Sequence, residues 1–232
     1  MKLTEITPEK LAGYFDHTQL RAYATKADFE KLCGEAKKYG FAMVAINPAP
    51  VALCRKLLEN TDIHVGAAVG FPLGQNTIAA KVFETEDAIK NGAHEIDYVV
   101  NLTQLKEKNY AYVEKEMASI VEICRKEKVV SKVIFENCYL TREEKLTLCR
   151  IARETGPDFI KTSTGFGTGG ATFEDVELMK NAVGDNIKIK AAGGIRSLET
   201  ALRMIGLGVS RIGSTASVEI VEELKRKEAH GA

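Results

Sequence analysis

The chain of 232 residues lacks several features that would direct it to particular partners. It has no excess of charge, because 32 Lys and Arg residues balance 32 Asp and Glu residues, and no basic stripe stands out. This balance disfavours nucleic acid and membrane surfaces as partners. No apolar run approaches the length of a membrane span, and the first ten residues contain no apolar segment typical of a signal peptide. We therefore expect a cytoplasmic protein without a nucleic-acid or membrane partner.

Patterns typical of disulfides, metals and dinucleotides are also absent. The five cysteines are odd in number and contain no CxxC pair, so we expect buried, reduced thiols. The four histidines form no HxH or HExxH cluster. Nothing in their spacing predicts a metal site. No strand-like run leads into a GxGxxG turn with an acidic residue downstream, which disfavours a Rossmann-type sheet.

What the sequence does contain is a regular alternation of short β-rich runs and segments with helical periodicity. Eight strands in roughly 230 residues, each but the first clearly followed by a helix, imply a parallel sheet. That number favours a single-domain (β/α)8 barrel over residues 1–232, with an open Rossmann-like sheet as the alternative. The expected strands are 14–18, 42–47, 64–70, 95–101, 132–137, 158–163, 188–193 and 210–214.

Several helix starts have a capping signature. Thr25 with Asp28, and Thr141 with Glu144, have the spacing of capping boxes. Asn76 is expected to begin another helix, which ends near residue 92. The buried stripe of that helix is expected to contain Ile78, Val82, Thr85 and Ile89.

The barrel prediction determines where function should lie. Active sites of such barrels lie at the carboxyl ends of the strands, whereas polar residues at the other end are usually solvated or structural. Glycine-rich or hydroxylated loops follow the sixth, seventh and eighth expected strands. The polar candidates at the functional end are Asp16, Thr18, Asn47, Asp97, Glu136, Lys161 and Lys190.

Lys161 and Lys190 have a specific chemical use. They come from neighbouring strands, which lie about 4.8 Å apart in a sheet. If both side chains enter the barrel mouth, burial and the neighbouring like charge disfavour protonation of one amine. A shift of roughly three pKa units, about 4 kcal/mol, would leave half of that lysine neutral at pH 7 and able to attack a carbonyl. Lys188 shares the strand parity of Lys190, but Lys190 lies nearer the glycine turn at the functional end.

Imine chemistry also needs a group that moves protons. Asp97 lies among apolar residues of the fourth expected strand, so we interpret it as an acid/base group that acts directly or through water. Each residue alone has a simpler interpretation, since a lysine at a strand end usually extends to solvent and an aspartate can cap a turn. The combination of two lysines and an aspartate favours an imine-forming enzyme.

Two loops have the composition of a phosphate site. Residues 191–197 follow the seventh strand and 213–219 follow the eighth, and barrels often bind phosphate between these loops. Glycine lets backbone N–H groups approach an anion, and a helix N-terminus adds unpaired donors. Thr164 and Gly165 could form a third wall; alternatively, the glycines at 193 and 194 simply form a tight turn. Together, these features predict an enzyme that acts on a small phosphorylated carbonyl compound.

The sequence also resembles a known family over nearly its whole length. It is similar to the 2-deoxy-D-ribose-5-phosphate aldolases, which are class I, imine-forming aldolases with a (β/α)8 barrel. The segment around Lys161 is highly specific to that family. The matching motifs occur in order and are DHTQL (16–20), EIDYVVN (95–101), KVIFENCYL (132–140), DFIKTSTGFGTGGAT (158–172), KAAGGIR (190–196) and SRIGSTAS (210–217).

The resemblance implies reversible cleavage of 2-deoxy-D-ribose 5-phosphate to D-glyceraldehyde 3-phosphate and acetaldehyde. In this interpretation Lys161 forms the imine with C1 of the sugar, Lys190 perturbs it electrostatically, and Asp97 with Lys190 relays protons through water. The resemblance further implies a homo-oligomer, either a dimer or a tetramer, and neither a metal nor an organic cofactor. It implies contacts to the sugar phosphate from Asp16, Thr18, Thr164, Gly165, Gly193, Gly194, Gly213, Ser214 and Thr215.

Two of the positions that depart from the family pattern concern the expected pocket. Ala45 stands where many members carry a cysteine, a thiol that imine chemistry does not need. Thr215 and Ala216 stand where many members have a pair of hydroxyl residues. One side-chain contact to phosphate is therefore expected to be missing, while the backbone donors remain. Neither departure touches the lysine pair or the aspartate.

Other functions remain open on the sequence. The chain could be an imine aldolase for another phosphorylated sugar, a pyridoxal-phosphate-binding protein, or a non-catalytic barrel that senses sugar phosphates. Acetaldehyde release distinguishes the first alternative, and a yellow protein would indicate the second. Tight binding without turnover would indicate the third.

Overall fold

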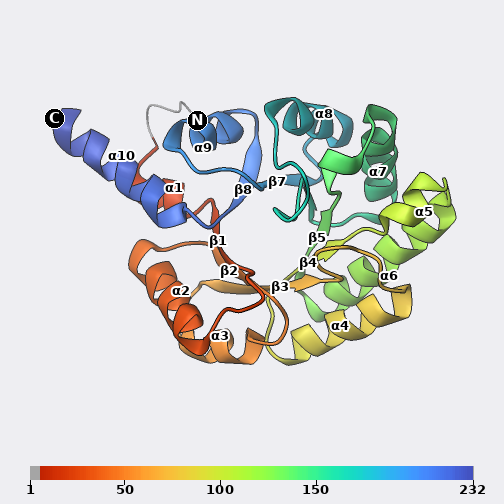
Figure 1. The fold of residues 1–232 in the computed structure, drawn as a ribbon, viewed down its shortest axis with the longest axis horizontal. Coiled ribbons are helices and arrows are strands. Elements are labelled where there is room, and N and C mark those ends of the chain that lie inside the picture. The colour runs from red at the N-terminus through yellow and green to blue at the C-terminus, as the bar shows by residue number, and fades with distance from the viewer. Residues whose placement is uncertain (1–5, 232) are drawn as a thin grey trace.

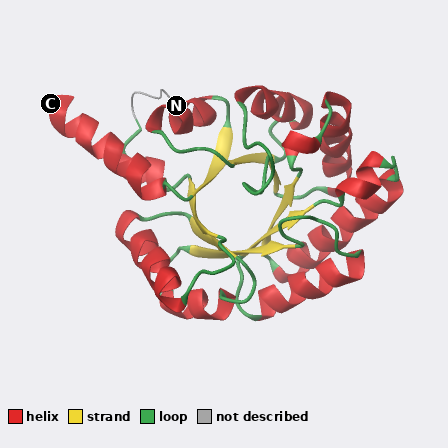
Figure 2. Cartoon of the chain, in the orientation of Figure 1, coloured by secondary structure: helices red, strands yellow, loops and turns green. Residues whose placement is uncertain are grey.

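The computed structural model describes residues 6–231, so both ends of the predicted 1–232 domain lie outside the described residues. Eight parallel strands close into a barrel in the order β1 to β8, and helices surround it (Figure 1, Figure 2). This architecture confirms the predicted (β/α)8 barrel. The strands are β1 (Phe15–Gln19), β2 (Met43–Ile46), β3 (His64–Val69), β4 (Glu95–Val99), β5 (Val130–Ile134), β6 (Phe159–Lys161), β7 (Lys188–Ala192) and β8 (Val209–Ser214).

The helices occupy the connections between the strands and the two ends of the described chain. Within residues 6–231, no helix is both long and apolar enough to cross a membrane. The helices are α1 (Pro8–Ala12), α2 (Lys26–Tyr39), α3 (Val51–Leu57), α4 (Ile78–Lys90), α5 (Leu102–Lys106), α6 (Tyr110–Glu127), η2 (Asn137–Tyr139), α7 (Arg142–Thr155), α8 (Phe173–Val183), α9 (Leu198–Gly206) and α10 (Ser217–Gly231).

Local sequence signals account for the ends of α2 and α7. The Asp28 carboxylate accepts a hydrogen bond from the backbone N–H of Thr25 at 2.7 Å, as the predicted capping box requires. The Glu144 carboxylate likewise accepts from the N–H of Thr141 at 2.7 Å. Both helices end at a glycine in the left-handed region, Gly40 and Gly156, where a side chain would be strained.

Helix α4 corrects one prediction. It begins after Thr77, whose hydroxyl accepts from the N–H of Ala80 at 3.2 Å, rather than after Asn76. Its buried residues are Lys81, Thr85 and Ala88, so only Thr85 of the expected stripe is buried. A fully buried lysine breaks the apolar periodicity on which the prediction depended.

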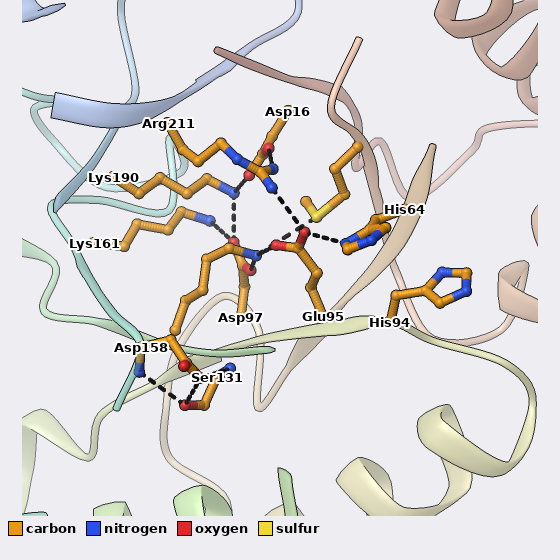
Figure 3. Close-up of polar contacts among 12 residues, drawn as sticks. Asp16, His64, His94, Glu95, Asp97, Ser131, Asp158, Lys161, Lys190 and Arg211 are labelled. Carbon is orange, nitrogen blue, oxygen red and sulfur yellow. Dashed lines mark hydrogen bonds and ion pairs between the residues drawn. The ribbon is translucent and has the colours of Figure 1, made fainter. Parts of the chain in front are cut away.

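Side chains alternate along each strand, so one face of the strand packs against the helices and the other faces the inside of the barrel. In β4, Ile96 and Tyr98 belong to the apolar core shared with the surrounding helices. Glu95 and Asp97 occupy the opposite face and point into the barrel (Figure 3). The apolar core therefore lies between the strands and the helices, whereas β4 turns its acidic face inward.

The barrel interior is charged, although such barrels usually fill it with branched apolar side chains. Register places Lys161 beside Lys190 and Lys190 beside Arg211 on adjacent strands. Buried charge is costly unless it is paired, and clusters of this kind are common at functional sites. The charged residues that meet inside the barrel are Asp16, Glu95, Asp97, Lys132, Lys161, Lys190 and Arg211.

Candidate active site

A cavity of about 220 Å³ opens at the carboxyl ends of the strands, between the loops that follow β6, β7 and β8. Lys161 and Lys190 form part of its wall, together with Ala45. Asp16 and Asp97 are not among its lining residues. The predicted site residues that line it besides the two lysines are Thr18, Thr164, Gly165, Gly193, Gly194, Gly213, Ser214 and Thr215.

Lys161 lies at the end of β6 with only 3% of its surface exposed. Its Nζ lies 2.8 Å from Oδ2 of Asp97. Burial lowers the pKa of Lys161 to about 8. The negative charge of Asp97 raises this pKa, while the positive charges of Lys190 and Lys132 lower it further. Burial is thus the main cause and the neighbouring lysine a smaller one. A lysine with this pKa is neutral in about a tenth of molecules at pH 7.

Lys190 contacts the same carboxylate oxygen as Lys161, namely Oδ2 of Asp97. Its Nζ is 2.6 Å from Oδ2 of Asp97 and 2.5 Å from Oδ2 of Asp16. Lys188 is exposed, and its ammonium lies 5.5 Å from the ring of Phe159. The lysine of β7 that reaches the site is therefore Lys190, as expected from its position along the strand.

Asp97 is enclosed by lysines. Oδ1 lies 2.7 Å from Nζ of Lys132, and Oδ2 contacts both Lys161 and Lys190. Burial alone would raise the pKa of Asp97, but the three ammonium charges outweigh it and hold the pKa well below its usual range. Asp97 is therefore a carboxylate in the resting protein.

Three further charged residues of the interior were not among the predicted site residues. Lys132 and Glu95 are fully buried and pair with each other. Arg211 bridges Oδ1 of Asp16 at 2.5 Å and Oε1 of Glu95 at 3.0 Å. Strand parity could have found them, because each is a charged residue on the inward face of a strand in a motif already recognised.

These contacts close a ring of alternating charge, drawn in part in Figure 3. We call it the charge ring: it passes from Asp97 to Lys190, Asp16, Arg211, Glu95, Lys132 and back to Asp97. At the amino-terminal end of β3, Nδ1 of His64 lies 2.7 Å from Oε1 of Glu95. Within residues 6–231, Asp97 is the one ion-pair partner of Lys161.

Asp16 and Thr18 were both expected to line the pocket, but they occupy different depths. Asp16 is fully buried beneath the cavity, in contact with Lys190 and Arg211. The Thr18 hydroxyl donates to the backbone oxygen of Asp16 at 2.8 Å and borders the cavity. The structure thus places Thr18 on the wall and Asp16 below it, where the carboxylate contacts Lys190.

The glycine-rich loops form a cradle of backbone groups. Gly165, Gly193 and Gly194 have φ angles of 87°, 88° and 78°, which favour glycine. Among the hydrogen bonds of the described residues, none uses the backbone N–H of these three glycines. A Cβ atom on Gly193 would come within 2.9 Å of the Cα of Gly170, so the packing also requires glycine there. These N–H groups are available to an anion in the cavity.

Two hydroxyl groups of the cradle, those of Ser214 and Thr164, already have partners. Ser214 Oγ donates to the backbone oxygen of Ile195 at 2.7 Å and accepts from the N–H of Ala216 at 3.0 Å. Thr164 Oγ1 donates to Glu136, whose carboxylate also accepts from the Thr164 N–H at 3.1 Å. These two side chains hold the loops in place, which leaves the backbone N–H groups and the exposed Thr215 hydroxyl as donors to the cavity. Glu136 therefore supports the loop from below.

The predictions about metal sites and cysteines concern side chains outside the cavity. The described residues contain no group of three or more His, Cys, Asp or Glu side chains that could hold a metal ion. All five cysteines are free, and Cys138 alone is half-buried rather than buried. Cys138 lies beside Glu136, with Sγ 4.0 Å from Oε1.

Comparison with known sequences assigns the family. A model of the DeoC/LacD family aldolases matches residues 10–214. The chain belongs to this family. The deoxyribose-phosphate aldolase of Lactobacillus acidophilus is 57% identical over 219 residues, covering 94% of this chain and 92% of the relative. The enzyme of the same name from Bacteroides thetaiotaomicron is 55% identical over 223 residues, covering 96% and 94%.

Solved structures described as deoxyribose-phosphate aldolases have the same fold. A putative deoxyribose-phosphate aldolase from Coccidioides immitis superimposes with a TM-score of 0.91 at 37% identity, covering 95% of this chain and 87% of that chain. The deoxyribose phosphate aldolase of Aeropyrum pernix, described as having a unique tetrameric structure, gives 0.88 at 31% identity, covering 94% and 92%.

Proposed function

We propose that this family member is a class I deoxyribose-phosphate aldolase, which reversibly cleaves 2-deoxy-D-ribose 5-phosphate to D-glyceraldehyde 3-phosphate and acetaldehyde. The observation that carries the proposal is Lys161, a buried amine with a pKa of about 8 that opens on a cavity. The names of relatives that are 57% and 55% identical support the substrate.

The proposed chemistry uses Lys161 as the nucleophile. Nζ adds to the C1 aldehyde, and loss of water gives the imine. The C3 hydroxyl then loses its proton, the C2–C3 bond breaks, and glyceraldehyde 3-phosphate leaves while the bonding electrons remain in an enamine. Protonation at C2 and addition of water release acetaldehyde and restore the amine.

Asp97 and Lys190 are the proposed proton-handling groups. They lie within 2.6 Å of each other, and Lys190 borders the cavity while Asp97 lies behind it. A water in the cavity could therefore exchange protons with Lys190, with Asp97 stabilising the ammonium form. This arrangement lets protons reach the carbinolamine oxygen and C2 without a side chain entering the space of the sugar.

The 5-phosphate is proposed to bind in the cradle. The free N–H groups of Gly165, Gly193 and Gly194 and the start of α10 at residue 217 supply donors. The described residues that line the cavity include no carboxylate and four cations, namely Arg21, Lys161, Lys190 and Arg196. Such a lining favours an anionic substrate over an uncharged sugar.

Borohydride trapping tests the proposal. The purified protein is incubated with 2-deoxy-D-ribose 5-phosphate, reduced with borohydride and digested for peptide mapping, while acetaldehyde is measured in a parallel sample. We expect a stable adduct on Lys161, none on the exposed Lys188, and acetaldehyde in amounts that match the glyceraldehyde 3-phosphate formed. An adduct on another lysine, or turnover without acetaldehyde, would overturn the assignment.

Three finer properties belong to the same proposal. We propose that residues 1–232 act as one domain, that the protein works in the cytoplasm, and that it assembles as a homo-oligomer, either a dimer or a tetramer. The tetrameric relative from Aeropyrum pernix supports the last of these. Light scattering coupled to size-exclusion chromatography measures the assembly directly, and a monomeric mass at micromolar concentration would contradict it.

A further inference from the structure

Lys132 is a fully buried lysine that the proposed chemistry does not use. It comes from β5 and is not among the residues that line the cavity, so it does not contact the substrate. Its Nζ pairs with Glu95, lies 2.7 Å from Oδ1 of Asp97 and lies 3.5 Å from Sδ of Met43. A buried lysine in a catalytic barrel without a chemical step of its own requires an explanation.

The two oxygens of Asp97 have different partners. Oδ1 contacts Lys132, whereas Oδ2 contacts Lys161 and Lys190. Lys132 thereby fixes the rotation of the carboxylate, since turning it would break the Oδ1 contact. It also takes up part of the negative charge that would otherwise stabilise the ammonium form of Lys161.

The charges of the interior balance only when Lys161 is neutral. The charge ring contains the carboxylates of Asp16, Glu95 and Asp97 and the cations Lys132, Lys190 and Arg211, so it is neutral as a whole. A protonated Lys161 adds an unbalanced positive charge in a site of low dielectric. Lys161 is therefore the surplus amine of the barrel.

We propose that Lys132 is a positioning residue for the aldolase reaction, which holds Asp97 by one oxygen and balances the interior charge so that Lys161 remains the surplus amine. The inference rests on the proposed imine chemistry at Lys161. The groups that face Lys161 are Asp97 of β4, Lys190 of β7 and, behind Asp97, Lys132 of β5. Asp16, Glu95 and Arg211 complete the ring, and His64 of β3 contacts Glu95.

The variant Lys132→Met tests the charge balance. Methionine is an unbranched side chain one atom shorter than lysine, and it leaves three carboxylates facing two other cations, so a protonated Lys161 now restores neutrality. We expect the acid limb of the profile of kcat/KM against pH to move up by about one unit or more, a loss of about tenfold at pH 7. Activity should recover as the pH is raised.

A second substitution distinguishes charge balance from simple damage. Glu95→Gln in the wild-type background removes one carboxylate, so the acid limb should move down by about one unit. In Lys132→Met combined with Glu95→Gln, two carboxylates face two cations and Lys161 is again the surplus amine. We expect the double variant to return the acid limb to within a few tenths of a unit of the wild-type position.

The matched control is Lys81→Met. Lys81 is also fully buried and paired with a glutamate, Glu116 at 2.6 Å, but it lies on α4 outside the barrel interior. Its removal should leave the acid limb in place. If the wild-type enzyme is active and trapped on Lys161, but Lys132→Met and Glu95→Gln leave the acid limb unmoved or move it in the same direction, the inference is wrong and the proposed function stands. Absence of trapping on wild-type Lys161 would instead remove the proposed function.

Discussion

Two buried lysines of this barrel, Lys81 and Lys161, make a direct comparison. Lys81 is fully buried between α4, β4 and α6, where Nζ lies 2.6 Å from Glu116 and donates to the backbone oxygens of Gly74 and Val99 at 2.8 and 2.7 Å. Lys161 is almost as deeply buried but has a single carboxylate partner, which it shares with two other lysines. Burial lowers the pKa of both lysines.

The difference between them lies in access and in partners. Lys81 has a glutamate and two carbonyl groups to itself and is not among the residues that border the cavity. Lys161 competes for one carboxylate oxygen and lies on the wall of the cavity. A lowered lysine pKa therefore does not identify a nucleophile unless the amine can also meet a carbonyl.

The largest expected effect is the loss of activity on substitution of Lys161, which is not expected for Lys81. Lys161→Ala should reduce turnover by roughly 10⁴-fold or more, because Lys190, the other lysine on the cavity wall, is held by the carboxylates of Asp16 and Asp97. Circular dichroism and the thermal midpoint should show an intact fold, since removing a surplus buried cation relieves its desolvation cost. Retention of more than a hundredth of the activity would contradict the role of Lys161.

Asp97→Asn tests whether the shared carboxylate serves the proton transfers. We expect kcat to fall by roughly 10²-fold or more, with a smaller change in KM, because Asn can accept a hydrogen bond but cannot stabilise the ammonium of Lys190. Steady-state kinetics over several pH values measures this. A change confined to KM would indicate that Asp97 serves binding alone.

Lys190→Leu tests whether the positive charge of Lys190 contributes to the lowered pKa of Lys161. Loss of this cation leaves more of the charge of Asp97 for Lys161, so the pKa of Lys161 should rise from about 8. Because the neutral amine is the reactive form, activity at pH 7 should fall by roughly 10- to 100-fold and recover in part as the pH rises. An unchanged pH–rate profile would refute the perturbing role.

Lys81→Met should lower the stability of the protein without shifting the pH–rate profile, the reverse of what is expected at Lys161. Removing one partner of a buried pair leaves Glu116 uncompensated, and we expect the free energy of unfolding to fall by about 3 kcal/mol. Urea denaturation measures the loss, and adding Glu116→Gln should restore part of it. The position of the pH–rate profile should not change; a shift would show that Lys81 acts on the site.

Much of this architecture could be predicted from the sequence, because the signals are local. The eight β-rich runs, the capping boxes at Thr25 and Thr141 and the glycine loops each depend on a few adjacent residues. Lys161 and Asp97 were recognisable because polar residues interrupt apolar strands at the functional end. The same physical reasoning placed Lys190 rather than Lys188 in the interior.

Strand parity marks Lys132 and Arg211 as inward-facing, but their partners could not be predicted because the pairs form across the barrel. Lys132 is 35 residues from Asp97 in sequence, and Arg211 is 195 residues from Asp16. No local pattern joins such pairs, and a lysine on a strand more often reaches solvent. Lys81 was missed for the related reason that its partner, Glu116, lies on a different helix.

The protonation state of Lys161 is the central physical property, and NMR measures it directly. With ¹³C- and ¹⁵N-labelled lysine, the signal of Lys161 is assigned by its loss in Lys161→Arg and followed from pH 6 to 11. We expect its Cε and Nζ shifts to titrate with a midpoint near pH 8, well below that of an ordinary lysine at about 10.4. A signal that stays that of an ammonium up to pH 10 would mean that the barrel does not hold this amine ready for imine formation.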